Sequence, residues 1–301
     1  MSIEFVKYSK LYFVISGIMI VASIVCILVF GLKFGTEFTG GSIMELAFQE
    51  ERPSLAILQQ TLSEFDLGEI VMQPVDDNEM ILRMKEIDSQ TREGILLKLQ
   101  ESYQIEEKSF EMIGPTIGKE LRQKTVNAII MVLLAITLYI TIAFYKVSWS
   151  AIRSWQYGIA SLLALFHDII IPLGVLAVLG KLYNIEITIP VIAALLTILG
   201  YSVHDTIIIF DRIRENLLKT RSKSFEEIVD ISLNQTLWRS ISTVLTVLFV
   251  LFAIFFLGGQ TLQSFSLTLI IGLSSGAYSS IFIAGPLLVA WARWRQRKVR
   301  I

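Results

Sequence analysis

His204 and Asp205 lie inside an apolar run that otherwise has the composition of the end of a membrane span. Placing an ionised side chain in hydrocarbon costs at least ~2.5 kcal/mol, so an ionisable residue at such a position indicates a functional site. A buried carboxylate without a partner would mostly take up a proton. The position therefore indicates reversible proton binding, provided that another group can shift the balance between the two forms.

The expected partner of Asp205 is Arg239, near the start of the next apolar run. Asp205 precedes Asp211 by six residues, which places it roughly 9 Å inside the boundary of its span at ~1.5 Å per residue. Arg239 can reach inward from the same side, so an ion pair between the two is expected. Burial favours the protonated acid and a nearby guanidinium favours the carboxylate, so movement of Arg239 would bind or release a proton. Two alternatives stay open: a structural hydrogen bond for Asp205, and anchoring of Arg239 at the membrane surface.

A second pair, His167 and Asp168, lies in another apolar run and partly repeats the pattern of His204 and Asp205. Asp168 is therefore a further candidate for proton coupling, or for a purely structural hydrogen bond. Two histidines on separate helices without a third ligand make a poor metal site, so neither a metal nor a cofactor is expected. Polar residues near the carboxyl groups are expected to support them by hydrogen bonding: His167, His204, Thr206, Asn234, Gln235, Ser242 and Thr243.

A membrane must position these residues, because 53% of the 301 residues are hydrophobic and concentrate in long runs. The first run is too long for a signal peptide and lacks a small-residue cleavage site, so it is expected to remain as an anchor. In the last run, small residues recur every four positions from Thr268 through Gly272 and Gly276 to Ser280, which predicts close helix packing. Six runs are long enough for spans of ~20 residues: Leu11–Leu32, Val126–Tyr145, Tyr157–Leu179, Ile189–Phe210, Ile241–Leu257 and Phe265–Trp291.

Basic residues near the ends of the runs predict the orientation. With six spans, residues 1–10 and 292–301 are expected in the cytoplasm, 33–124 outside it, and five of the spans in 125–291. The segment from Lys33 to Gln123 has 18 acidic and 9 basic residues, and the scattered positive charge elsewhere argues against nucleic-acid binding. The basic residues that would lie on the cytoplasmic side are Lys7, Lys10, Lys146, Arg153, Arg212, Arg214, Lys219, Arg221, Lys223, Arg293, Arg295, Arg297, Lys298 and Arg300.

The outer segment has the pattern of a small ferredoxin-like α+β domain, with the order β-α-β-β-α-β. Asp76, Asp77 and Asn78 would form a hairpin turn. The single cysteine, Cys26, allows no internal disulfide, so the domain must be stable by packing alone. The expected strands and helices, in chain order, are strand Ser42–Phe48, helix Ser54–Phe65, strands Glu69–Val75 and Glu79–Met84, helix Gln90–Tyr103 and strand Ile105–Ile113.

Glycine-rich segments flank this domain at both membrane junctions. Glycine permits a positive φ and a close backbone approach, so each segment could be a tight junction or a hinge. The residues singled out there are Gly35, Glu37, Gly40, Gly41, Gly114, Pro115 and Gly118.

Five blocks of this sequence resemble, in order, the signature blocks of the SecF branch of the SecD/SecF family of bacterial protein-export membrane proteins. The resemblance covers nearly the whole chain, with one departure: Glu37 stands where the family usually has aspartate. The blocks are FGTEFTGG (34–41), GPTIGKEL (114–121), ALFHDIIIPLG (164–174), GYSVHDTIIIFDRIREN (200–216) and SLNQTLWRS (232–240).

The resemblance implies a fold and a role. The fold is an α-helical polytopic membrane protein with six transmembrane helices, one RND-type half, and one extracytoplasmic ferredoxin-like domain between the first two helices. The role is a non-enzymatic one in the inner membrane, where the protein works with SecD, the SecYEG channel and other accessory membrane proteins. Such a unit uses the proton-motive force to promote late translocation of unfolded polypeptides. The resemblance also implies that Asp205 and Arg239 are the essential pair, with a less defined role for Asp168.

Three other classes of protein stay open. An RND-type exporter of lipids or small molecules would usually carry two six-span halves and larger outer domains. A structural or receptor-like membrane protein would not need Arg239. An intramembrane aspartyl protease could use Asp168 and Asp205, but the sequence lacks the YD and GxGD surroundings expected of that class.

Overall fold

The computed structural model describes residues 3–75, 78–145, 152–220 and 222–299. Asp76 and Asp77 of the expected turn, and the basic residues Lys146, Arg221 and Arg300, lie outside these ranges. The chain divides into two units. A helical unit comprises the chain up to Lys33, Ala128–Glu186 and the part from Pro190 onward, and an α+β unit comprises Phe34–Asn127 with Ile187–Ile189.

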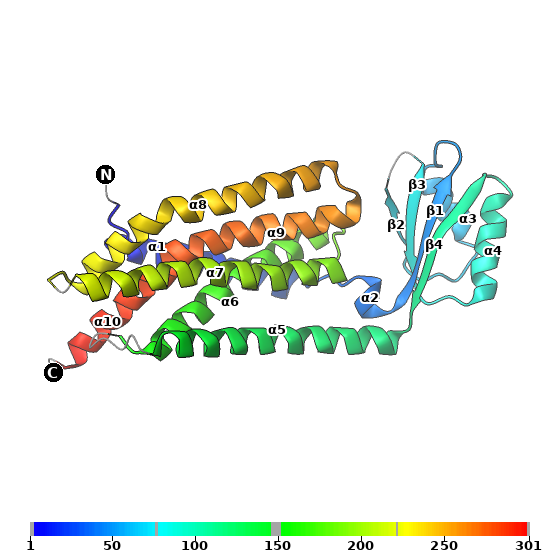
Figure 1. Cartoon of the computed structure of the whole chain (residues 1–301). Helices are drawn as coiled ribbons and strands as arrows, with labels where there is room; N and C mark the ends of the chain where they lie inside the picture. The colour runs from blue at the N-terminus through cyan, green and yellow to red at the C-terminus, as the bar shows by residue number, and fades with distance from the viewer. Residues whose placement is uncertain (1–2, 76–77, 146–151, 221, 300–301) are drawn as a thin grey trace. The chain divides into compact units, whose positions relative to one another are not determined.

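Six helices of the described residues are long and apolar enough to cross a membrane, which confirms the expected number. In the helical unit, the first and last described residues lie at the same end of the bundle, where α7 and α8 connect (Figure 1). The helices are α1 (Ser9–Phe30), α5 (Pro115–Ala143), α6 (Ser154–Tyr183), α7 (Ile189–Lys219) and α8 (Phe225–Leu257), and a last span made of α9 (Gln260–Ser279), a π-helix (Ser280–Ala284) and α10 (Gly285–Val299).

Among the described membrane helices, all except α1 are longer than the apolar runs, and α1 begins and ends two residues earlier than its run. The expected bounds are corrected accordingly. α7 continues to Lys219 instead of ending near Phe210, and α8 begins at Phe225 instead of near Ile241. Backbone hydrogen bonds of a helix do not require apolar side chains, so a helix continues until a cap stops it. Ser224 caps α8, accepting a hydrogen bond from the Glu227 backbone N–H while the Glu227 side chain accepts one from the Ser224 N–H.

Small residues bring the helices of the bundle close together. The buried positions of α1 are all serines, and Ser23 lies directly against Gly174 of α6. In the last span, Gly272 lies against Ile198 of α7 and Gly276 against Ser202. The row of small residues in the last span therefore packs closely against α7, as predicted.

The α+β unit has the ferredoxin-like order and confirms that expectation. Its strands form an antiparallel sheet in the order β2-β3-β1-β4, with Met44 opposite both Leu82 and Phe110. The sheet's β2 and both helices are shorter than expected, while β3 and β4 have the expected bounds. The elements are β1 (Gly41–Phe48), α3 (Leu55–Leu62), β2 (Val71–Pro74), β3 (Glu79–Met84), α4 (Ser89–Gln100) and β4 (Ile105–Ile113).

Alternation along the strands and a helical period in α3 and α4 produce the core of this unit. One face of the sheet buries alternate residues such as Leu46 and Leu82, and the helices bury Leu58 and Leu99 against them. This apolar core accounts for stability without a disulfide. The remaining core residues are Met44, Phe48, Leu62, Leu67, Met80, Met84, Ile87 and Ile95.

The two glycine-rich junctions pack against each other within this unit. Gly40 and Gly41 have φ of 81° and 147°, which disfavour other residues. A Cβ atom at Gly40 would lie 2.7 Å from Cα of Pro115, and one at Gly118 would lie 2.9 Å from the Gly40 nitrogen. Gly114 has no such neighbour. Close approach of the backbone therefore requires glycine at Gly40 and Gly118, but not at Gly114. Gly35 begins the short helix α2 (Thr36–Thr39), which contains Glu37.

Candidate functional site

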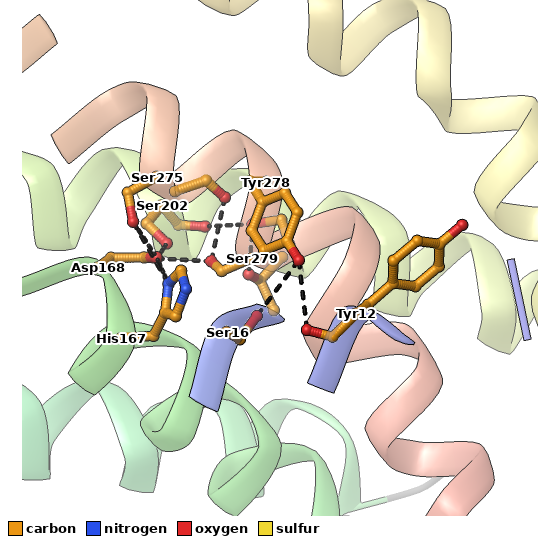
Figure 2. A network of polar contacts seen from close by, with 11 residues as sticks. Tyr12, Ser16, His167, Asp168, Ser202, Ser275, Tyr278 and Ser279 are labelled. Atoms are coloured by element: carbon orange, nitrogen blue, oxygen red, sulfur yellow. Dashed lines mark hydrogen bonds and ion pairs between the residues drawn. The ribbon is translucent and has the colours of Figure 1, made fainter. Parts of the chain in front are cut away.

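Asp168 is the most completely enclosed carboxylate in the described part of the helical unit. It is 0% exposed. On Oδ2 it accepts hydrogen bonds from Ser202 Oγ of α7 (2.5 Å) and Ser279 Oγ of α9 (2.7 Å), and Ser275 Oγ lies 3.4 Å from Oδ1 (Figure 2). Hydroxyl donors from two other helices thus supply the stabilisation that water would otherwise give a carboxylate.

His167 connects this carboxylate to α1. Its Nδ1 lies 2.9 Å from Asp168 Oδ1, and its Nε2 is buried and has no hydrogen-bond partner. The imidazole stacks on Tyr278, whose hydroxyl donates to the Tyr12 carbonyl and lies 3.3 Å from Ser16 Oγ (Figure 2). The Asp168 carboxylate is thus connected, through His167 and Tyr278, to Tyr12 and Ser16 of α1.

Helix geometry explains how this network forms. Ser275 and Ser279 are four residues apart and share one face of α9. Gly276 between them has no side chain, so α9 approaches Ser202, and a Cβ there would lie 3.6 Å from Asp168 Oδ2. Pro172 follows Asp168 by four residues within α6. Because proline has no N–H, the Asp168 carbonyl lacks its usual helical donor.

Asp205 has a different environment. It is 5% exposed and accepts one hydrogen bond on Oδ1, from Ser240 Oγ of α8 at 2.6 Å. Its second oxygen, Oδ2, is buried and has no hydrogen-bond partner. The carboxylate is thus half satisfied, unlike that of Asp168.

The expected ion pair between Asp205 and Arg239 is not formed among the described residues. Arg239 is exposed, while its neighbour Ser240 is buried against Asp205. Consecutive helical residues point about 100° apart, so only one of the two can face α7. Arg239 instead lines a cavity of about 580 Å³ between α5, α7 and α8. Asp211, Arg212 and other residues near the α7–α8 connection line the same cavity.

The other expected polar residues divide between two environments. Thr206 is buried, and its Oγ1 lies 2.9 Å from Ser280 Oγ. Asn234 forms two hydrogen bonds with the backbone of Ile3, accepting one from the N–H and donating one to the carbonyl. Gln235 accepts hydrogen bonds from Arg212 and Asn216. In contrast, His204 and Thr243 are exposed and Ser242 is half-buried, so the polar stripe of α8 mostly faces away from the bundle core.

The residue pattern did not identify the serines that surround the carboxylates. Ser202, Ser240, Ser275, Ser279 and Tyr278 supply most of the contacts, yet each is of a common type in a membrane helix. Only the four-residue spacing of Ser275 and Ser279, and of Gly276 and Ser280, could have indicated two polar faces on the last span. Among the described residues, no group of three His, Cys, Asp or Glu side chains could hold a metal.

Comparison with known proteins identifies the family. The model of the family "Protein export membrane protein SecD/SecF, C-terminal" matches residues 95–294, and that of the "SecD/SecF GG Motif" matches residues 27–51. The chain belongs to the SecD/SecF family. As a SecD/SecF member it is a membrane protein, and the glycine pair of its first junction falls within the matched motif.

Individual SecD/SecF proteins align along nearly the whole chain. Protein translocase subunit SecF of Thermobaculum terrenum is 38% identical over 96% of this chain and 94% of its own length, and that of Synechocystis is 34% identical over 99% and 97%. The crystal structure of SecDF, a translocon-associated membrane protein from Thermus thermophilus, matches with a TM-score of 0.84 and 32% identity. It covers 97% of this chain, which spans 39% of the SecDF chain.

Proposed function

We propose that this chain is the SecF-type subunit of a protein-export translocase, and that protonation of Asp205 drives its part of export. The observation that carries the proposal is the half-satisfied carboxylate of Asp205, which is nearly buried, has one hydroxyl donor and has one oxygen without a partner. Such a group exchanges a proton at lower cost than one with every lone pair occupied. The family match supports the assignment to export rather than to small-molecule transport.

Arg239 would act by moving. In this proposal the guanidinium leaves the cavity beside Asp211 and approaches Asp205 in one stage of the cycle, favouring the carboxylate, and withdraws in another, favouring the acid. One elementary charge crossing ~100 mV supplies ~2.3 kcal/mol, enough to bias a conformational step. Asp168, whose lone pairs are well occupied, would hold the helices in register and act as a secondary proton site.

The proposed partners are taken from the related SecDF structure and from the family match. Because it spans 39% of the related SecDF chain, we propose that it works with a SecD subunit and not alone. Further partners would be the SecYEG channel, the unfolded exported polypeptide and other accessory membrane proteins. The lysine and arginine residues near the ends of the membrane helices support a location in the bacterial inner membrane, with both termini in the cytoplasm. The α+β unit would then lie outside and contact the emerging polypeptide. No enzymatic step is required.

The test is to replace Asp205 by Asn, which keeps the shape and removes the charge, in the chain assembled with its SecD partner. Export of a preprotein into membrane vesicles and the accompanying proton flux should both fall to the level of vesicles lacking this subunit. Glu4→Gln, at an exposed position before α1, serves as the control and should retain both. Wild-type export and proton flux in the Asp205 variant would refute the proposal. The RND-type exporter alternative would gain support if the isolated chain transported lipids or small solutes.

A further inference from the structure

We propose that the N-terminal segment, residues 3–6, positions Ser240 on Asp205 by fixing the rotation of α8 about its axis. The segment acts through Asp230 and Asn234 near the start of α8, which are therefore positioning residues. This inference rests on the proposed function, because it concerns the hydrogen bond that Asp205 accepts. It gives a role to a segment that lies outside the residues matched by the family models.

The backbone of this segment is bound by two side chains of α8. Asn234 Oδ1 accepts a hydrogen bond from the Ile3 N–H at 2.9 Å, and Asn234 Nδ2 donates one to the Ile3 carbonyl at 2.8 Å. One turn earlier, on the same face of α8, Asp230 Oδ1 accepts a hydrogen bond from the Val6 N–H at 2.9 Å. The segment therefore lies beside the first turns of α8 (Figure 1).

The side chains of the segment are anchored in the core of the bundle. Phe5 is 1% exposed and Val6 is 3% exposed, and both belong to the buried apolar cluster that contains Val229 and Leu233 of α8. Phe5 also contacts Phe282 of the π-helix, with ring centroids 5.7 Å apart. The segment therefore has a fixed place in the bundle.

The segment is also joined to the start of α1. Ser9 Oγ donates a hydrogen bond to the Val6 carbonyl at 2.8 Å, and the Ser9 N–H donates to the same oxygen at 3.3 Å. α1 in turn packs closely against α6, where Ser23 meets Gly174. The segment thus connects α8 to the pair of helices α1 and α6.

From another side, α7 holds the same turns of α8. Asn216 of α7 donates hydrogen bonds to Ser232 Oγ and to Gln235 Oε1, each at 2.8 Å. At about 100° per residue, Ser232 and Asp230 point in nearly opposite directions from the axis of α8. The N-terminal segment and α7 therefore hold α8 from opposite faces, which prevents the helix from rotating about its axis. A contact on one face alone would leave it able to pivot.

The fixed rotation decides which residue of α8 faces Asp205. Ser240 follows Asn234 by six residues in one continuous helix, so the rotation set at Asn234 is carried to Ser240. Turning α8 by about 100° would bring Arg239 to the place of Ser240. The N-terminal segment therefore keeps Ser240 on Asp205 and Arg239 in its separate cavity.

The experiment uses the full chain assembled with its SecD partner in liposomes. Infrared difference spectroscopy after an upward pH jump records the rate at which a carboxyl C=O band disappears, and the band is assigned by its loss in Asp205→Asn. Asn234→Leu keeps a side chain of similar size and removes both hydrogen bonds to Ile3. It should slow proton release by about tenfold, as Ser240→Ala does, because both variants take a hydroxyl donor away from the carboxylate.

Further variants separate positioning from packing. Ile3→Pro, at an exposed position outside the helices, removes the N–H that donates to Asn234 and leaves α8 unchanged, so it should also slow release. It keeps the test valid if Asn234→Leu fails to assemble. Asp230→Asn still offers an oxygen to the Val6 N–H and should leave the rate unchanged. Glu4→Gln, at an exposed position in the same segment, is the matched control and should also leave it unchanged.

A double variant tests whether the segment acts through Ser240. In a Ser240→Ala background, Asn234→Leu should cause no further slowing, because the hydroxyl that it would displace is already absent. Additive slowing would overturn the inference, since the segment would then influence Asp205 by another route.

A purely structural role would also overturn the inference. In that case Asn234→Leu and Ile3→Pro would lower the Tm of the complex and leave the rate of proton release unchanged. An Asp205-dependent band with an unchanged rate in both variants refutes the positioning role and leaves the proposed function intact. Absence of any Asp205-dependent band would overturn the proposed function and, with it, this inference.

Discussion

Ser240, and not the adjacent Arg239, donates the hydrogen bond to Asp205, with Oγ and Oδ1 2.6 Å apart. The carboxylate that we propose to exchange a proton thus accepts its hydrogen bond from a neutral hydroxyl, while the arginine lies in a separate cavity. In the stage of the proposed cycle in which Arg239 is withdrawn, Asp205 can therefore change its protonation state without breaking an ion pair, whose rupture would leave an uncompensated charge in a medium of low dielectric constant.

Replacing Ser240 by Ala should impair proton release by Asp205, because the Ser240 hydroxyl stabilises the carboxylate and not the neutral acid. The variant leaves both carboxyl oxygens without a protein donor, and a hydrogen bond to a charged group is worth about 1.5–3 kcal/mol. Export driven by a proton gradient should fall by about tenfold, measured with inverted membrane vesicles. Ser240→Thr keeps a hydroxyl and should restore most of the activity, and Thr246→Ala on the exposed side of α8 should have no effect. Full activity of Ser240→Ala would show that the hydrogen bond is incidental.

Replacing Ser279 by Ala should destabilise the helical unit. Ser279 and Ser202 both donate to the same oxygen of Asp168, so its loss removes a bond worth about 1.5–3 kcal/mol. Thermal unfolding of the detergent-solubilised protein would measure the effect. Ser274→Ala is the control, because the Ser274 hydroxyl is exposed and bonds to the Ile270 carbonyl of its own helix. Equal unfolding temperatures for the two variants would contradict a stabilising network around Asp168.

The N-terminus of α4 should lose stability in acid. The Thr91 backbone N–H donates to Asp88 at 2.8 Å and holds the pKa of that carboxyl below its ordinary value of 3.8. A lowered pKa in the folded state means that the stabilisation is fully present above the unfolded pKa and is lost as the pH falls through the folded pKa. Hydrogen-exchange protection of α4 in the full chain should therefore be constant near neutral pH. It should fall as the pH drops below 3.8 toward the lower pKa of Asp88 in the folded state.

Two substitutions at position 88 separate the charge from the cap. Asp88→Asn can still accept the Thr91 hydrogen bond, so it should keep α4 protected at neutral pH but lose the acid dependence that comes from this group. Asp88→Ala should reduce protection at every pH. An acid dependence that is the same in the wild type and in Asp88→Asn would assign it to other carboxyl groups.

Substituting Gly40 by Ala should destabilise the α+β unit by more than about 1 kcal/mol, because the residue has a positive φ and its new Cβ would meet Pro115. Chemical denaturation followed by a probe in the α+β unit would measure the change. Gly118→Ala should also be destabilising, since its Cβ would meet the backbone of Phe38 and Gly40. Gly114→Ala is the control from the same segment, with open space around it. A tolerance of all three substitutions would contradict tight packing of the junctions.

Local patterns predicted the elements well, because period-two and helical spacings depend only on which side chains are apolar. The alternation of Met80, Leu82 and Met84 gave β3 its bounds, and the order of elements gave the ferredoxin-like sheet. The ends of the membrane helices were less predictable. A capping box at Ser224 started α8 well before its apolar stretch, and apolar composition does not report such a cap.

The site was only partly predictable for a similar reason. The cost of burying a carboxylate identified Asp168 and Asp205 from the sequence, but their partners depend on helix rotation and depth. A rotation of about 100° per residue decides whether Arg239 or Ser240 faces Asp205. The depth of a residue along its span does not determine which of the two side chains does so.

The five-residue π-helix at Ser280–Ala284 gives the last span a spare residue. Ser279 ends the regular helix on the side of Asp168, and Ser280 opens the wider turn on the side of Thr206. Tightening that turn into an α-helix would rotate α10 by about 100° relative to Ser275 and Ser279. The extra residue of the π-helix would thus allow α10 to rotate at the basic end of the bundle. Ser275 and Ser279 would keep their contacts with Asp168 during this rotation.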